Sequence, residues 1–342
     1  MKKMMAMLMA CGLCAGVAKA HGQGNTINGA GASFPAPVYR VWTYLYSEKS
    51  NIRVNYQSLG SGAGINQIKS GTVAFGGSDN PLEKSELDKH GLIQFPMLMG
   101  GVVLAINVPG ISSNQLKLDQ ETLSKIFLGE ITNWNDRSIA RLNSGLNLPD
   151  LKITVVSRAD SSGTTYIFTN YLSKISKVWA EKIGAGPAVN WPVGIRGQKN
   201  PGVCNNIKKI RGAIGYTEYT YAIESKLSTV VLRNLDGNFV SPTIESFKAA
   251  GANSDWRNAP GFRMILTEQP GADSWPITGL TYLLIHREQK DSALAKSLLD
   301  YIKWCFEHGA QSAIKLHYVP MPENVIKMVY DELDKVRYEG KK

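Results

Sequence analysis

The sequence is poor in the residues that build metal centres and disulfide frameworks. Its 342 residues include five histidines and four cysteines, and no two histidines have the His-x-x-x-His spacing of a helical zinc site. Cys11 and Cys14 fall in an apolar N-terminal segment. Cys204 and Cys305 remain, and they could either pair in an oxidising compartment or stay buried as thiols. We therefore expect no metal site and no disulfide framework.

The common motifs of phosphate and acyl chemistry are also missing. The chain has no Gly-x-x-x-x-Gly-Lys-Ser/Thr loop and no Gly-x-Ser-x-Gly elbow, and Gly29-Ala30-Gly31 holds too few glycines for a dinucleotide fingerprint. We expect no cofactor and no catalytic residue. An arginine beside serine hydroxyls leaves a phosphoesterase as an alternative, although such an enzyme needs an activated nucleophile or a metal-bound water.

Positive charge is in excess but is not concentrated. The formal net charge is +10, and the densest basic patch, Lys208-Lys209 with Arg211, is typical of a solvated helix face. A basic protein can attract small anions weakly. Nothing in the pattern indicates binding to nucleic acid.

No hydrophobic run is long enough for a comfortable membrane span. The apolar segment 4–17 follows the basic residues 1–3 and precedes Ala18-Lys19-Ala20, the pattern of a signal peptide cleaved after Ala20. Cleavage there would lower the net charge from +10 to +7. A buried N-terminal helix and lipid anchoring at Cys11 are less favoured alternatives. We expect an exported, periplasmic protein.

The chain is long enough for two domains, and its pattern alternates between strands and helices. This alternation predicts parallel βαβ architecture. The apolar run 95–106 predicts a strand that passes from one domain to the other, and 280–285 predicts one that returns to the first sheet. The other predicted elements are strands at 53–56, 73–77 and 153–156, and helices at 38–46, 65–68, 121–127, 166–172, 292–306 and 323–336. The second α/β unit also holds a hairpin or turn at 191–194, the segment 212–216 and an irregular region at 253–271.

The most informative stretch is Arg158 to Thr165, which follows a predicted strand and precedes a predicted helix. Free backbone N–H groups at a helix start can receive an anion, and the guanidinium of Arg158 can bind an oxyanion with two parallel hydrogen bonds. Ser162 and Thr164 add hydroxyls, and Gly163 permits close approach. An ordinary helix cap is the competing interpretation.

Similar turns occur earlier in the chain. Ser33 and Phe34 lie at one predicted helix start, Ser61 lies at another, and Asp79 follows a buried strand, where ligands bind in open α/β sheets. Together with the later stretch, these residues could hold a tetrahedral oxyanion. Asp79 could instead be a simple turn residue before Pro81.

A carboxylate at an anion site needs a reason. Close to an anion, Asp79 would add a repulsion of about 4 kcal/mol at 4 Å and an effective dielectric constant of 20. The arrangement becomes favourable when the ligand carries a proton that Asp79 can accept. Phosphate near neutral pH carries such a proton and sulfate does not, so Asp79 predicts selection for phosphate.

Several motifs resemble the periplasmic phosphate-binding proteins of ABC-type phosphate transporters. They occur in the family's order over nearly the whole chain after residue 20: residues 29–39, 75–79, 158–164, 212–216 and 275–278. Two positions depart from the family pattern. Ser33 replaces a common threonine but keeps the hydroxyl, and Gly62-Ala63 replace two residues of a serine-serine-glycine-glycine pattern, which puts in doubt only a contact beside the site.

The resemblance implies an α/β, type II periplasmic-binding-protein fold with two lobes, a ligand cleft and a hinge. With residues 1–20 as the signal peptide, the expected lobes are 21–98 plus 274–342 for lobe 1 and 99–273 for lobe 2. It implies high-specificity binding of inorganic phosphate by a monomer, without catalysis, and delivery to the permease subunits of an ABC transporter. The same fold binding another oxyanion such as sulfate is a further alternative. Asp160 would pair with Arg158, and the phosphate ligands would be Ser33, Phe34 through its backbone, Ser61, Asp79, Arg158, Ser162, Gly163 and Thr164.

Overall fold

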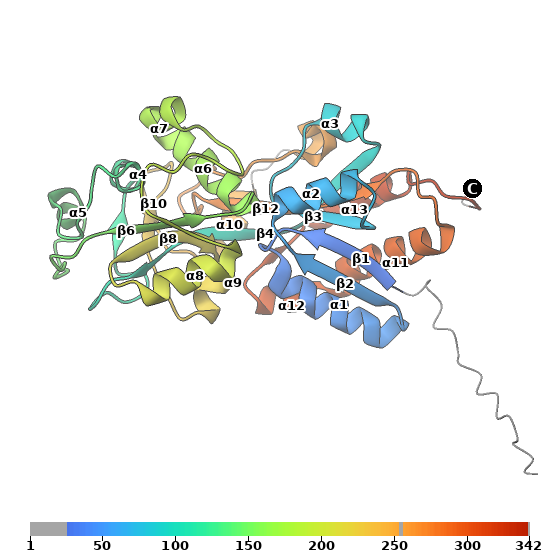
Figure 1. Cartoon of the computed structure of the whole chain (residues 1–342), viewed down its shortest axis with the longest axis horizontal. Coiled ribbons are helices and arrows are strands. Elements are labelled where there is room, and N and C mark those ends of the chain that lie inside the picture. The colour runs from blue at the N-terminus through green and yellow to red at the C-terminus, as the bar shows by residue number, and fades with distance from the viewer. Residues whose placement is uncertain (1–25, 253–255, 341–342) are drawn as a thin grey trace, which may run out of the picture.

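The computed structural model describes residues 26–252 and 256–340. Two halves lie side by side along the long axis of the molecule, one formed by both ends of the chain and the other by its middle (Figure 1). The predicted signal peptide, residues 1–20, lies outside the described residues. Among the residues that are described, no helix is both long and apolar enough to cross a membrane.

One continuous sheet passes through both halves. Its main path has the strand order β2-β1-β3-β12-β4-β8-β6-β7, and β13 and β9 pair with β4. A smaller sheet has the order β11-β10-β5. The strands are β1 Thr26–Gly31, β2 Arg53–Ser58, β3 Phe75–Ser78, β4 Leu92–Asn107, β5 Lys117–Leu118, β6 Thr154–Arg158, β7 Ile195–Gly197, β8 Ala213–Glu218, β9 Ser228–Thr229, β10 Val231–Arg233, β11 Phe239–Val240, β12 Thr278–His286 and β13 Val319–Pro320.

Strand β4 belongs to both halves. Residues 92–101 pair with β12 and residues 102–107 pair with β8. Fifteen of its sixteen residues are buried, which explains the unbroken apolar run in the sequence. Opposite the register shift at Thr281/Tyr282, β4 carries Pro96, which has no N–H to donate to a regular ladder. One buried strand, β4, therefore runs through both halves.

The prediction of parallel pairing is correct only at the two ends of the sheet. Strand β1 is parallel to β2 and β3, and β6 is parallel to β7 and β8. In the middle, β12 is antiparallel to β3 and β4, and β4 is antiparallel to β8. An apolar run buried throughout its length has no pattern that reveals strand direction. The predicted return of 280–285 to the first sheet is confirmed.

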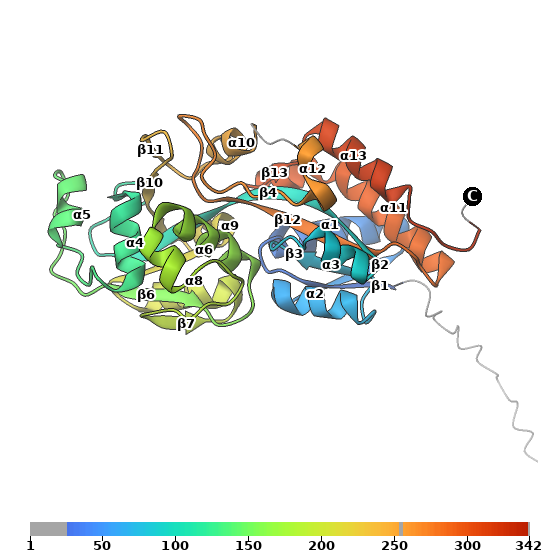
Figure 2. The same ribbon diagram turned by 90° about the horizontal axis from the view of Figure 1, so that it is seen from above.

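Helices cover both faces of the sheet. In one half α11 and α13 lie on one side of the strands and α2 on the other (Figure 2), and in the second half α6 and α8 lie on opposite sides (Figure 1). The helices are α1 Ala36–Ser50, α2 Ser61–Lys69, α3 Lys84–Lys89, α4 Gln120–Leu128, α5 Arg137–Leu142, α6 Gly163–Ile175, α7 Lys177–Lys182, α8 Lys199–Lys209, α9 Tyr219–Glu224, α10 Ile244–Ala252, α11 Ser292–His308, α12 Ala310–Lys315 and α13 Glu323–Leu333.

The remaining expectations can be compared with this architecture. The described part of the region 253–271 includes two short 3₁₀ helices, η1 Trp256–Asn258 and η2 Pro260–Phe262, and 191–194 forms a bend without strand pairing.

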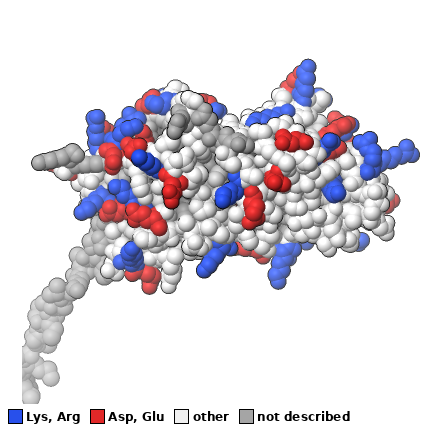
Figure 3. All heavy atoms as spheres, turned by 180° about the vertical axis from the view of Figure 1, so that it is seen from behind, with Lys and Arg blue, Asp and Glu red and all other residues white. Residues whose placement is uncertain are grey.

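Cys204 and Cys305 are both free and buried, which decides between the two alternatives left by the sequence. The lobe boundaries at 98/99 and 273/274 stay a prediction. Acidic and basic side chains are interspersed on the face shown in Figure 3.

Candidate functional site

The starts of two helices from opposite halves contact each other at the centre of the molecule. Ser61 is the first residue of α2, and its Oγ accepts hydrogen bonds from the backbone N–H of Gly163, the first residue of α6, at 3.0 Å and from that of Asp79 at 3.1 Å. The N–H of Gly62 donates to the carbonyl of Ser161 at 3.1 Å. Ser61 and Asp79, which the lobe boundaries predict in lobe 1, therefore lie beside Gly163, which they predict in lobe 2.

Glycine is required where the starts of α2 and α6 meet. A Cβ on Gly163 would lie 2.5 Å from both the Cβ of Asp79 and the Oγ of Ser61. Gly60, which precedes α2, has a φ of +101° and faces the carboxylate of Asp160. These positions need a residue without a side chain, which explains the glycines at both helix starts.

Arg158 ends strand β6 with its side chain 1% exposed. Its Nε and Nη2 donate to the two carboxylate oxygens of Asp160 at 2.9 and 2.6 Å, and its Nη1 donates to Thr164 Oγ1 at 3.3 Å. Burial opposes ionisation of Asp160, but its hydrogen bonds with Arg158 and the charge of the guanidinium lower its pKa overall. The carboxylate fixes the orientation of the guanidinium, leaving Nη1 directed at the helix start.

Ser162 is the N-cap of α6, because its Oγ accepts a hydrogen bond from the N–H of Thr165 at 3.1 Å. The alternative of an ordinary helix cap is thus correct in geometry. It does not exclude the anion-site interpretation, because a capping hydroxyl accepts with its oxygen and can still donate its own proton. Like Thr164 beside it, Ser162 is buried. The start of a 13-residue helix also carries a partial positive charge.

Asp79 follows β3 and is only 2% exposed. Its Oδ2 is 3.5 Å from Ser61 Oγ, and its Oδ1 has no hydrogen-bond partner among the described residues. Burial raises the pKa of Asp79 to about 7, against the opposing effects of the Thr281 hydroxyl and of the charge of Arg158. A buried carboxyl group with an unpartnered oxygen is suited to accept a proton from a ligand.

Three tyrosines hold the loop that contains Ser33 and Phe34. Tyr56 OH donates to the carbonyl of Ala32 at 2.8 Å, Tyr221 OH donates to that of Ser33 at 2.7 Å, and Tyr318 OH donates to that of Phe34 at 2.6 Å. The ring of Phe34 is fully buried. The backbone of this loop is therefore fixed from three separate segments of the chain.

The sequence analysis did not identify Asn200 as a site residue, although its side chain is fully buried at the site. It lies at the start of α8, where its N–H and Nδ2 donate to Ser33 Oγ at 3.3 and 3.1 Å and its Oδ1 accepts from Arg158 Nη1 at 3.3 Å. Pro201 follows it directly, and Lys199 before it has a φ of +58°. An Asn-Pro pair indicates the beginning of a turn or helix, and this signal could have identified a fourth helix start.

Comparison with known proteins places this arrangement in a family. Residues 17–306 match the model of the PBP superfamily domain. The phosphate-binding protein PstS of Xylella fastidiosa is 48% identical over 303 residues, covering 89% of this chain and 83% of that protein, and PstS of Pasteurella multocida is 47% identical over 307 residues, covering 90% and 89%. The chain belongs to the phosphate-binding protein family of the PBP superfamily.

Solved structures support the fold of this family member. A high-affinity periplasmic phosphate-binding protein bound with phosphate aligns with a TM-score of 0.71 and 21% identity, covering 90% of this chain and 93% of that structure. A phosphate ABC transporter substrate-binding protein from Clostridium perfringens aligns with a TM-score of 0.62 and 19% identity, covering 87% and 100%. The expected two-lobed, type II periplasmic-binding-protein fold is confirmed.

Asn200 provides a first test of the site in this family member. Asn200→Ala would remove the two side-chain hydrogen bonds that hold Arg158 and Ser33 and keep the one from the backbone N–H, so we expect phosphate affinity to fall roughly 5- to 150-fold, the effect of about 1–3 kcal/mol. Isothermal titration calorimetry with phosphate measures it. Asn205→Ala on the exposed side of the same helix is the matched control. Unchanged affinity in Asn200→Ala would show that the asparagine does not position the site.

Glu218, at the end of β8, predicts a pH dependence of stability. It is fully buried, its Oε1 accepts from the N–H and Oγ1 of Thr220 at 3.0 and 3.2 Å, and its Oε2 has no hydrogen-bond partner among the described residues. Burial raises its pKa from 4.5 to about 8. The folded protein therefore retains a proton that the unfolded chain loses, and stability falls as pH rises between about 4.5 and 8.

Glu218→Gln should reduce this fall, because glutamine resembles the protonated carboxyl group. We expect Tm to rise by about 2–4 °C at pH 9 and to change by about 1 °C or less at pH 5. Thermal unfolding followed by circular dichroism measures both values. The exposed Glu224→Gln is the control. An equal change of Tm at both pH values would contradict the assigned ionisation.

Proposed function

We propose that this protein binds inorganic phosphate between its two lobes and delivers it to the permease of an ABC transporter. The observation that carries the proposal is that two helix starts contact each other beside a buried cation, Arg158, and a buried carboxyl group, Asp79. The proposed ligands are Ser33, Phe34, Ser61, Asp79, Arg158, Ser162, Gly163 and Thr164, and Asp160 supports Arg158.

Each group has a separate task. Arg158 neutralises the anion, and the helix starts and hydroxyls donate hydrogen bonds to its oxygens. Asp79 accepts the proton that phosphate still carries. Sulfate brings no proton, so it would leave the carboxylate facing an unprotonated oxygen, with both repulsion and an unmade hydrogen bond. The site therefore favours phosphate over sulfate.

Closure around the ligand follows from the connections between the lobes. We assign residues 21–98 and 274–342 to lobe 1 and 99–273 to lobe 2, so that β4 crosses the boundary and β12 begins just after it. Ser61 and Gly163 would then contact each other across the cleft. A hinge at the shared strands lets the walls separate for phosphate to enter, a motion for which periplasmic binding proteins are a known example.

Export and the absence of catalysis complete the proposal. The signal-peptide pattern of residues 1–20 supports a periplasmic location with cleavage after Ala20, and we propose a monomer that meets the permease there. A phosphomonoesterase is less well supported. Ser61 Oγ accepts from two backbone N–H groups, and no histidine lies beside it in the contacts described above.

Titration of the purified protein with phosphate and with sulfate at pH 8 tests the function. We expect saturable 1:1 binding of phosphate, with sulfate at least about 100-fold weaker. Similar affinity for the two anions would overturn the selectivity. Steady release of phosphate from a chromogenic ester would instead support the esterase.

A further inference from the structure

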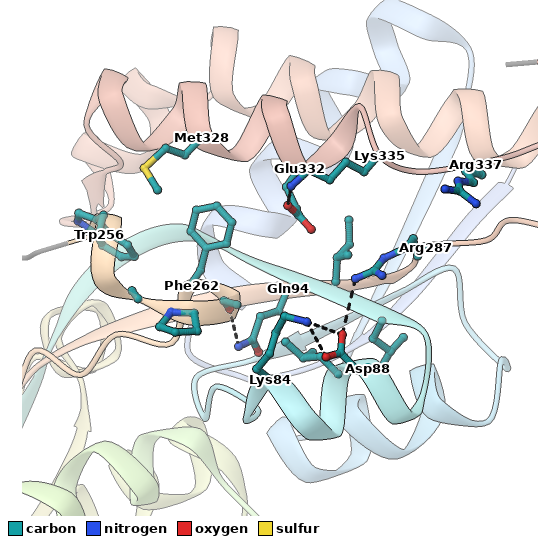
Figure 4. Close-up of a pocket in the computed structure, with 16 residues that line it drawn as sticks. Lys84, Asp88, Gln94, Trp256, Phe262, Arg287, Met328, Glu332, Lys335 and Arg337 are labelled. Carbon is teal, nitrogen blue, oxygen red and sulfur yellow. Dashed lines mark hydrogen bonds and ion pairs between the residues drawn. The ribbon is translucent and has the colours of Figure 1, made fainter. Parts of the chain in front are cut away.

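A cavity lies between the half that contains both chain ends and the segment 256–262, and it shares no residue with the proposed phosphate site. Its volume is about 520 Å³, within the range of small-molecule sites, and it lies between α3, β4, η2 and α13. Figure 4 shows apolar side chains gathered at one end of this cavity and basic side chains at the other. Nothing in phosphate binding accounts for this polarity.

Phe262 and Met328 form the apolar end together with Trp256. Leu87 and Leu92 also line the cavity. Phe262 has a φ of +58°, a conformation that is costly for a bulky residue. Backbone strain of this kind persists only where the surroundings enforce it. Here it places an aromatic ring in the wall of the cavity.

The wall that carries Phe262 is firmly held. The amide of Gln94 donates to the carbonyls of Leu82 and Gly261, both at 2.8 Å. Tyr282 OH accepts from the N–H of Met264 at 3.2 Å and donates to its carbonyl at 2.8 Å. Because the segment on both sides of Phe262 is anchored to the central strands, the cavity is a formed feature of the fold.

Arg287 is the least satisfied cation of the basic end. Its Nη2 is 3.8 Å from Asp88 Oδ1, but both oxygens of Asp88 already accept from Lys84 Nζ at 2.5 Å. Its Nε is buried with no hydrogen-bond partner among the described residues. The backbone of Arg287 is fixed on both sides, by its N–H to Gly91 O and by Arg337 N–H to its carbonyl, each at 2.8 Å. The side chain of Arg287 is 40% exposed, and the Nη groups of a guanidinium held by only one ion pair at 3.8 Å can receive a carboxylate.

The charges of the lining also favour an anion. Four basic residues and two acidic residues line the cavity. Lys335 is paired with Glu332 at 2.5 Å and Arg337 with Glu288 at 3.6 Å, so the local acids are already engaged. A cationic ligand would have to displace one of these pairs. An anion could bind Arg287 without displacing either pair.

We infer that this cavity binds an amphipathic organic anion, with its carboxylate on Arg287 and its apolar body against Phe262 and Met328. The proposal names a chemical class and does not depend on phosphate binding at the other site. Octanoate is a suitable probe, because it has a carboxylate head and a flexible apolar chain.

Isothermal titration calorimetry of the protein in saturating phosphate tests the inference. We expect saturable 1:1 binding of octanoate, and at least tenfold weaker binding of acetate, which lacks the apolar body, and of octylammonium, which has the opposite charge. Lack of saturable octanoate binding, or equally tight binding of octylammonium, would overturn the proposal.

Two variants locate the probe. Arg287→Gln and Met328→Glu should each weaken octanoate binding at least tenfold, while Arg211→Gln, an exposed arginine outside the cavity, should leave it unchanged. Phosphate affinity measured on the same samples shows that each variant is folded. Octanoate affinity within twofold of the wild type in both cavity variants would place the ligand elsewhere and refute the assignment.

Discussion

Arg158→Ala should reduce phosphate affinity by roughly 30-fold to several-thousand-fold, the effect of about 2–5 kcal/mol when one partner of a buried charge pair is truncated. The substitution removes the cation that would face the anion. It also leaves Asp160 without the guanidinium that now occupies both of its oxygens at 2.9 and 2.6 Å. A carboxylate without this partner would then repel phosphate at close range.

Calorimetric titration with phosphate measures the loss, and the exposed Arg211→Ala provides a matched arginine control. Asp160→Asn separates the two contributions. It keeps Arg158 while loosening its orientation, so we expect a smaller loss than in Arg158→Ala. Phosphate affinity within threefold of the wild type in Arg158→Ala would remove this residue from the proposed site.

Asp79→Asn should change which anion is bound more than whether an anion is bound. The amide can donate to an oxyanion and no longer repels sulfate, but it loses the charged acceptor for the proton of phosphate. Since a hydrogen bond to a charged group contributes about 1.5–3 kcal/mol, we expect the ratio of phosphate to sulfate affinity at pH 8 to fall roughly 10- to 150-fold. Competitive titration with the two anions measures this ratio.

The protonation of Asp79 provides an internal check. Its pKa is raised to about 7 by burial, so the carboxyl group is mostly ionised at pH 8 and mostly protonated at pH 5.5. The wild-type protein should therefore discriminate less well against sulfate at pH 5.5, whereas Asp79→Asn should show little change between the two pH values. An unchanged wild-type ratio over this range would argue against Asp79 as the selecting group.

The residues of the candidate site were predictable from the sequence where they lie in a polar turn between a strand and a helix. Ser33, Ser61 and Arg158 each lie at such a point, and the structure brings their elements together. Asn200 was missed because Pro201 and Gly202 in the first turn of α8 are typical of loops, and because the left-handed backbone of Lys199 leaves no clear trace in the sequence. The three tyrosine anchors were missed for another reason: a buried hydroxyl finds its partner only in the tertiary structure.

The fold could be predicted in its elements but not in all their directions. Continuous burial makes β4 and β12 easy to recognise as strands and gives no indication that they are antiparallel. The direction depends on pairing between residues about 180 positions apart, as between Thr278 and Gly101, which no local pattern contains. Likewise, the unpaired state of Cys204 and Cys305 follows from their places in α8 and α11.

The position of β12 between β3 and β4 sets the order in which the molecule can be completed. These two neighbours lie in residues 75–107, whereas β12 spans Thr278–His286. When the chain is synthesised from its N-terminus, β3 and β4 therefore exist long before β12. The position between them in the sheet stays unfilled until most of the chain has been made. Pairing β12 with β3 and β4 forms contacts of long sequence separation, so we expect this folding step to be slow. The late strand thus delays completion of the sheet in the first half of the molecule, which would suit the export across a membrane that we propose from the signal-peptide pattern.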